Sequence, residues 1–127
     1  MEHIRCWAAG IGAVLGDFFG TFDSLLYALV LFVTVDYITG VLSAAVEGRL
    51  SSQTGFRGIC QKVCLFALVG MANILDNHIL GGTCVLRTAV IFFYLSNEGI
   101  SILENTARIG VPIPGKLREV MEQLKKK

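Results

Sequence analysis

Charged residues are scarce in this chain of 127 residues: Asp, Glu, Lys and Arg together make up 17% of it. Globular domains of ordinary composition contain about 25% charged residues. Hydrophobic residues reach 54%, and the mean hydropathy is +0.64. A soluble chain this short has much surface for its volume and would lack the charges to cover it. The composition therefore predicts one small domain, residues 1–127, whose apolar surface lies in lipid.

The sequence also lacks the motifs of common enzyme and metal sites. It holds no phosphate-binding loop, no H-E-x-x-H and no G-x-S-x-G. Its four cysteines form no C-x-x-C pair, and His3 and His78 are isolated. We therefore expect no catalytic residues, no cofactor and no metal. The net charge of only +1 argues against nucleic acid as a partner.

Three apolar segments, 25–46, 59–75 and 85–103, predict helices that cross a membrane. The segment 25–46 is the strongest, because it holds twelve Leu, Ile, Val or Phe residues and a single charge. At about 1.5 Å per residue it covers a hydrocarbon core of about 30 Å. A polar stretch with several Gly and Ser residues, 47–58, is predicted to be the connection before the second span.

The first apolar segment, residues 4–22, is rich in small residues. They recur at every fourth position: Ala8, Gly12, Gly16 and Gly20. In lipid, such a ridge lets two helix backbones approach closely. We therefore predict that it is a surface for helix packing or oligomerisation. Because Asp17 interrupts the segment, it either spans the bilayer or lies along its surface, which gives three to four transmembrane helices in total.

Four charged residues fall within the predicted spans: Asp36, Lys62, Arg87 and Glu98. Ionisable side chains inside a membrane are energetically unfavourable, so they are usually paired or functional. The predicted depths favour the pairs Asp36–Arg87 and Lys62–Glu98 between helices. Two interpretations remain open: the charges hold the helices together, or they line water in the lumen of an oligomer.

The C-terminal end is basic, since six Lys or Arg residues accompany two Glu residues from position 108 onward. Residues 115–127 are predicted to form a short amphipathic helix. The basic tail and the basic connection 47–58 should both face the cytoplasm. The turn 76–84 contains no Lys or Arg and should face outward.

Several stretches from residue 25 onward resemble a known family. They are V-D-Y-I-T-G at 35–40, N-E-G-I-S-I-L-E-N at 97–105, P-I-P at 112–114 and the basic tail. Together they are similar to the phage holin family that includes the holin-like proteins of clostridial toxin-secretion loci.

The resemblance implies a non-enzymatic, multi-pass protein of the bacterial cytoplasmic membrane. Such proteins form homo-oligomeric pores or lesions that release an endolysin or permit export of a large toxin. Two other functions remain open: a small ion channel or carrier subunit, and a membrane adaptor that binds another protein through its tail. The fold predicted is all-α, with three to four transmembrane helices and a C-terminal amphipathic helix.

Overall fold

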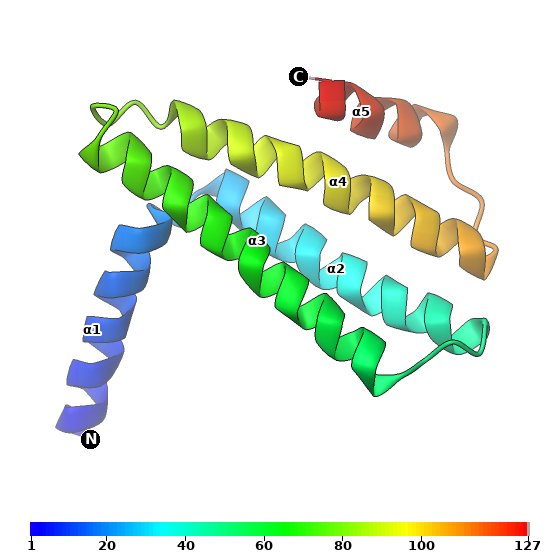
Figure 1. Ribbon diagram of the computed structural model, residues 1–127, viewed down its shortest axis with the longest axis horizontal. Coiled ribbons are helices and arrows are strands. Elements are labelled where there is room, and N and C mark those ends of the chain that lie inside the picture. The colour runs from blue at the N-terminus through cyan, green and yellow to red at the C-terminus, as the bar shows by residue number, and fades with distance from the viewer. Residues whose placement is uncertain (127) are drawn as a thin grey trace.

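The computed structural model describes residues 1–126, and these form five α-helices without any strand (Figure 1). The helices are α1 Glu2–Phe19, α2 Ser24–Val46, α3 Ser52–His78, α4 Val85–Ile109 and α5 Gly115–Lys126. The prediction of an all-α fold is confirmed. Of the predicted tail helix 115–127, the last residue lies outside the described part of the chain.

Helices α2, α3 and α4 form a three-helix bundle, in which α2 and α4 are parallel and α3 is antiparallel to both (Figure 1). The centre of the bundle is apolar. Leu29, Val69 and Ile91, one from each helix, are 0% exposed. Because these side chains fill the space between the helices, a single copy has a packed core along its axis.

The predicted connection 47–58 is too long. Helix α3 already begins at Ser52, because the side chain of Ser51 accepts a hydrogen bond from the Thr54 amide, 3.1 Å away, and caps the helix. Gly55 and Gly58 lie inside α3. A Cβ atom there would lie 3.3 Å and 3.4 Å from the side chain of Tyr37, so these glycines allow close packing of α2 and α3.

Two helices, α2 and α3, are long and apolar enough to cross a membrane, fewer than the three to four predicted. Arg87 and Glu98 lower the hydropathy of α4, and Glu2, Arg5 and Asp17 lower that of α1. By length and hydropathy, the candidate membrane spans are therefore the antiparallel helices α2 and α3.

Helices α1 and α5 lie outside the bundle. Helix α1 runs across the bundle axis at the end where α2 begins, and it has no buried residue (Figure 1). Helix α5 folds back over α4, where Met121 is 9% exposed. A Cβ atom at Gly99 would collide with the sulfur of Met121, so the bare backbone of Gly99 is what lets α5 approach α4.

Candidate functional site: charges inside the helix bundle

A charged cluster joins the three helices of the bundle. Lys62 of α3 places its Nζ 2.5 Å from Asp36 Oδ2 of α2. The same Nζ lies 2.7 Å from Oε2 and 2.9 Å from Oε1 of Glu98 on α4. Asp36 and Glu98 are 7% and 6% exposed. One ammonium is thus the counter-ion of two buried carboxylates. The three side chains carry a formal charge of −1 when all are ionised.

Asn105 of α4 completes this cluster. Its Nδ2 donates to Asp36 Oδ1 at 3.0 Å, to the Asp36 carbonyl at 3.2 Å and to Thr39 Oγ1 at 3.1 Å. Each carboxylate or amide therefore has a partner on a neighbouring helix. These contacts join α2, α3 and α4 at one level of the bundle, and removal of one partner would leave a buried charge unpaired, which is strongly destabilising.

The predicted pairs have different outcomes. The Lys62–Glu98 pair is present, with Asp36 as its third member. The Asp36–Arg87 pair is wrong, because Arg87 pairs with Asp23 at the N-terminal end of α2. Asp36 lies about 20 Å further along α2 than Asp23, at about 1.5 Å per residue.

A second polar cluster holds the end of α1 against the bundle. The guanidinium of Arg87 donates from Nε to the Phe19 carbonyl at 2.9 Å and from Nη2 to the Thr21 carbonyl at 3.0 Å. Its Nη1 lies 3.0 Å from Asp23 Oδ2. Asp76 accepts hydrogen bonds from the backbone amides of Leu86 and Arg87 at 3.1 Å and 2.7 Å, and so caps α4.

Asn73 of α3 is the other contact to α1. Its Nδ2 donates to the carbonyls of Asp17 and Phe18, both at 3.0 Å. We call Asn73 and Arg87 the α1 latch, because together they bind the last carbonyls of α1 and its linker. Gly20 has a φ of 85°, and a Cβ atom there would lie 2.8 Å from Asn73 Oδ1.

The carboxyl of Asp23 has two roles in this region. It accepts a hydrogen bond from the Leu26 amide at 3.0 Å and so begins α2. The hydrogen bond from Arg87 lowers the pKa of Asp23 below its ordinary value. The side chain is 41% exposed, so solvent screens this interaction.

The ridge of small residues on α1 is divided between two environments. Gly20 lies against the α1 latch. A Cβ atom at Gly12 or Gly16 would have no neighbour within 4 Å, and Ala8 is exposed. The surface predicted for helix packing is therefore open in a single copy, and its role in oligomerisation stays a prediction.

Sequence reasoning missed Asn73, Asp23 and Asn105 as members of polar clusters. A signal existed for two of them. Asn73 is a polar residue inside an otherwise apolar run, and Asp23 directly precedes an apolar helix, the usual place for a capping residue. Asn105 lies beside Glu104 near the end of α4, where an exposed polar residue would be unremarkable.

Within residues 1–126 no group of three or more His, Cys, Asp or Glu side chains lies together to hold a metal ion. The four cysteines are free thiols on the exposed surface. The polar side chains of these two clusters thus contact one another and backbone groups. They place charges and hydrogen bonds inside an otherwise apolar bundle.

Two comparisons with known proteins identify a family. The profile described as "Bacteriophage holin family" matches residues 13–126. A "Probable holin" of Bacillus phage phi105 is 42% identical over 96 residues, 76% of this chain and 70% of that protein. An uncharacterised 14.9 kDa protein in the nagH 3′ region of Clostridium perfringens is 39% identical over 127 residues, 100% of this chain and 96% of that protein. An uncharacterised protein of Listeria innocua is 47% identical over 112 residues, 88% of this chain and 79% of that protein. No solved structure matches the chain.

Proposed function

The chain belongs to the bacteriophage holin family, and from this we propose that it acts as a holin. Copies accumulate in a bacterial cytoplasmic membrane and associate into pores or lesions. These let an endolysin reach the cell wall or let a large toxin leave the cell. The protein acts through its assembly and catalyses no reaction.

We propose that α4 crosses the membrane together with α2 and α3. Helix α4 packs along α2, and the charged cluster ties it to both neighbours at one depth. If α2 and α3 span, α4 therefore lies in the same hydrocarbon layer. Its Arg87 and Glu98 are 4% and 6% exposed, so their charges face protein and not lipid.

The orientation of the bundle follows from its basic residues. Three arginines lie at one end of the bundle: Arg49 in the α2–α3 connection, Arg57 near the start of α3 and Arg108 near the C-terminal end of α4. The opposite end carries Asp23 and Asp76, and its one arginine in the bundle residues described, Arg87, is buried and paired with Asp23. Under the positive-inside rule, the arginine-rich end and α5 face the cytoplasm.

The observation that carries the proposal is the charged cluster of Asp36, Lys62 and Glu98 in a bundle with an apolar exterior. A single bundle has a packed core, so passage of a folded enzyme needs a ring of several copies. In such a ring the side chains of Asp36, Lys62 and Glu98 could contact water in the lumen in place of one another. The charges that hold one copy together are thus the groups that can line a pore after reorganisation.

The open part of the small-residue ridge, Gly12 and Gly16, is the contact surface we propose between copies. In lipid, helices associate through small residues that allow close backbone approach. A Cβ atom at either position meets no atom of its own chain within 4 Å, and the groove of about 980 Å³ that both residues line has room for a leucine side chain. Leucine there should therefore fit in a single copy and occupy the space that an approaching helix needs.

The experiment is inducible expression in a bacterium, with membrane potential and lysis as readouts in the presence of an endolysin. We expect abrupt depolarisation and lysis with the native chain. Gly12→Leu and Gly16→Leu should delay lysis and reduce cross-linked oligomers. Gly10→Leu is the matched control, because Gly10 is equally free of neighbours but lies on another face of α1.

Each alternative function predicts a different result. A carrier would show substrate-dependent uptake without depolarisation, and an adaptor would change neither uptake nor potential. Either result with the native chain would refute the holin proposal. Lysis at the native time with Gly12→Leu and Gly16→Leu would instead refute only the ridge as the contact surface.

A further inference from the structure

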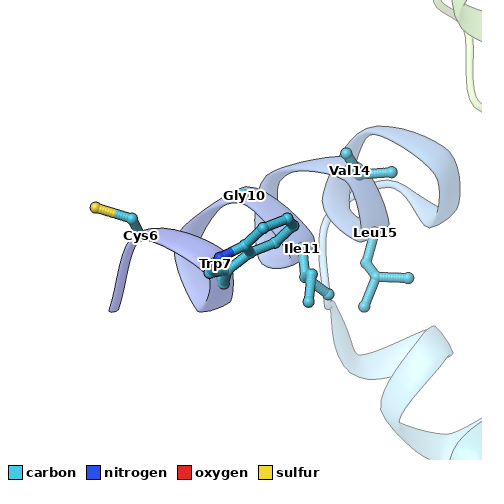
Figure 2. A pocket seen from close by; sticks show the side chains of 6 residues that line it. All are labelled: Cys6, Trp7, Gly10, Ile11, Val14 and Leu15. Atoms are coloured by element: carbon cyan, nitrogen blue, oxygen red, sulfur yellow. The ribbon is translucent and has the colours of Figure 1, made fainter. Parts of the chain in front are cut away.

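Helix α1 presents a large apolar surface that no other described element covers. Trp7 is 73% exposed, Ile11 57% and Leu15 49%. Figure 2 shows Ile11 and Leu15 projecting from the same side of α1, with Trp7 beside them. They line a shallow pocket on the surface of α1, and all six residues that line it belong to this helix. In aqueous solution these apolar side chains would be exposed to water, so α1 needs an apolar partner.

The α1 latch sets the position of this helix. Asn73 and Arg87 donate four hydrogen bonds to backbone carbonyls between Asp17 and Thr21. Phe18 also packs against the bare backbone of Gly70, where a Cβ atom would collide with its ring. These contacts place α1 across the end of the bundle and not beside it (Figure 1). A spanning α1 would instead run beside the bundle, an arrangement that differs from the one these contacts hold.

The side of α1 that faces the bundle is apolar. Its residues Leu15, Phe18 and Phe19 line a groove of about 980 Å³ together with residues of α2 and α3, among them Leu26 and Phe66. The groove joins the apolar face of α1 to the exterior of α2 and α3 that the proposed function places in lipid. The charged residues Glu2 and Asp17 do not line it.

We infer that α1 is an interfacial helix, which lies along the outer membrane surface with its apolar side in the lipid. The inference rests on the proposed function, because it takes the bundle to span the bilayer. The end that carries α1 is then the outer boundary of the membrane. In a single copy lipid chains fill the groove under α1, and a helix of a second copy displaces them where it contacts Gly12 and Gly16. Trp7 has the amphipathic ring that is typical of this boundary. The chain crosses three times, and its N-terminus lies outside.

The test measures the depth of three positions on α1 in the full chain. Trp7 is the single tryptophan, so its fluorescence reports one site. Two variants move it: Trp7→Phe with Ile11→Trp, and Trp7→Phe with Leu15→Trp. Each protein is reconstituted in phosphatidylcholine–phosphatidylglycerol vesicles that contain lipids brominated either near the headgroup or deep in the acyl chain. Trp7→Phe with Leu31→Trp, which reports an exposed position on α2, is the control for the bundle.

An interfacial helix predicts stronger quenching by the shallow bromines at all three α1 positions, with equal depth within error. A spanning helix predicts a depth that changes by about 12 Å between positions 7 and 15, at about 1.5 Å per residue. That progression would overturn the inference. Absence of quenching at all three positions would also overturn it, because α1 would then lie in water or against another copy.

The control separates this inference from the proposed function. Tryptophan at position 31 should be quenched most strongly by the deep bromines. If it is, and the α1 positions show a progression, only the interfacial position of α1 is refuted. If the tryptophan at position 31 is not quenched by the deep bromines, the membrane-spanning bundle itself is refuted.

Discussion

Asp36 and Glu98 approach from two helices that run in the same direction, and they share one counter-ion, the ammonium of Lys62. The two carboxylates are therefore not equivalent to two separate ion pairs. Removal of Lys62 leaves two like charges buried together, whereas removal of one carboxylate leaves a matched pair. Removal of Lys62 should therefore lower the free energy of unfolding more than removal of one carboxylate does.

We predict that Lys62→Met lowers the free energy of unfolding by about 3–5 kcal/mol, because both buried carboxylates lose their counter-ion. Glu98→Gln should have a much smaller effect, since Asp36 and Lys62 remain paired and the amide still accepts a hydrogen bond. Unfolding of the protein in detergent micelles, followed by circular dichroism during denaturant titration, measures both. Lys116→Met, at an exposed position of α5, is the matched control. Equal stability of the Lys62 and Lys116 variants would contradict the cluster as a source of stability.

Sequence patterns predicted the helices well where apolar periodicity and caps coincide. The expected bounds of the strongest segment, 25–46, differ from α2 by one residue at its start. The helix that contains the second predicted span, 59–75, begins earlier than expected, at Ser52, because Gly55 and Gly58 are typical of turns in a sequence. Their actual role is close packing against Tyr37, which depends on a neighbouring helix and leaves no local signal.

The charges show a similar limit. Lys62 and Glu98 were paired correctly because both lie at the same end of well-defined helices. Arg87 was given the wrong partner because its acceptors are Asp23 and the backbone carbonyls of the linker after α1. A backbone carbonyl has the same chemistry at every residue, so no residue type in the sequence marks it as a binding partner.

The Arg87–Asp23 pair predicts a pH dependence. The hydrogen bond from Arg87 lowers the pKa of Asp23, so folding favours the ionised carboxylate. A carboxyl with a lowered pKa contributes stability above its unfolded pKa, about 3.9, and this contribution is lost as the pH falls through the folded value. Asp23→Asn removes the charge and keeps the helix cap.

We therefore expect the native chain to be more stable than the Asp23→Asn variant above about pH 5 and equal to it at pH values well below the lowered, folded pKa of Asp23. The difference should not exceed about 1 kcal/mol, because Asp23 is 41% exposed. Thermal unfolding in detergent across this pH range measures it. Glu119→Gln, on exposed α5, corrects for general acid effects. A constant difference between the native and Asp23→Asn proteins at every pH would contradict the ion pair.

The docking of α5 depends on the missing side chain of Gly99. A Cβ atom there would collide with the sulfur of Met121 and lie 3.3 Å from the ring of Phe32. Phe32 is packed against the apolar core of the bundle, so Met121 is the group that must move. Because Met121 is a buried contact of α5 with α4, its displacement weakens the attachment of the helix.

We predict that Gly99→Ala weakens the attachment of α5 by about 1 kcal/mol, the low end of the cost of overpacking, because the colliding sulfur belongs to a flexible side chain. Undocked α5 should be cleaved by trypsin after Lys116 and Arg118 about fivefold faster, since about 1 kcal/mol changes a population by that factor. Limited proteolysis in detergent, followed by mass spectrometry, measures the rate. Gly115→Ala at the start of α5 is the control, because its Cβ meets no atom within 4 Å and should leave cleavage unchanged or slower. Cleavage of the Gly99→Ala protein at the native rate would mean that the Gly99–Met121 contact does not hold α5 in place.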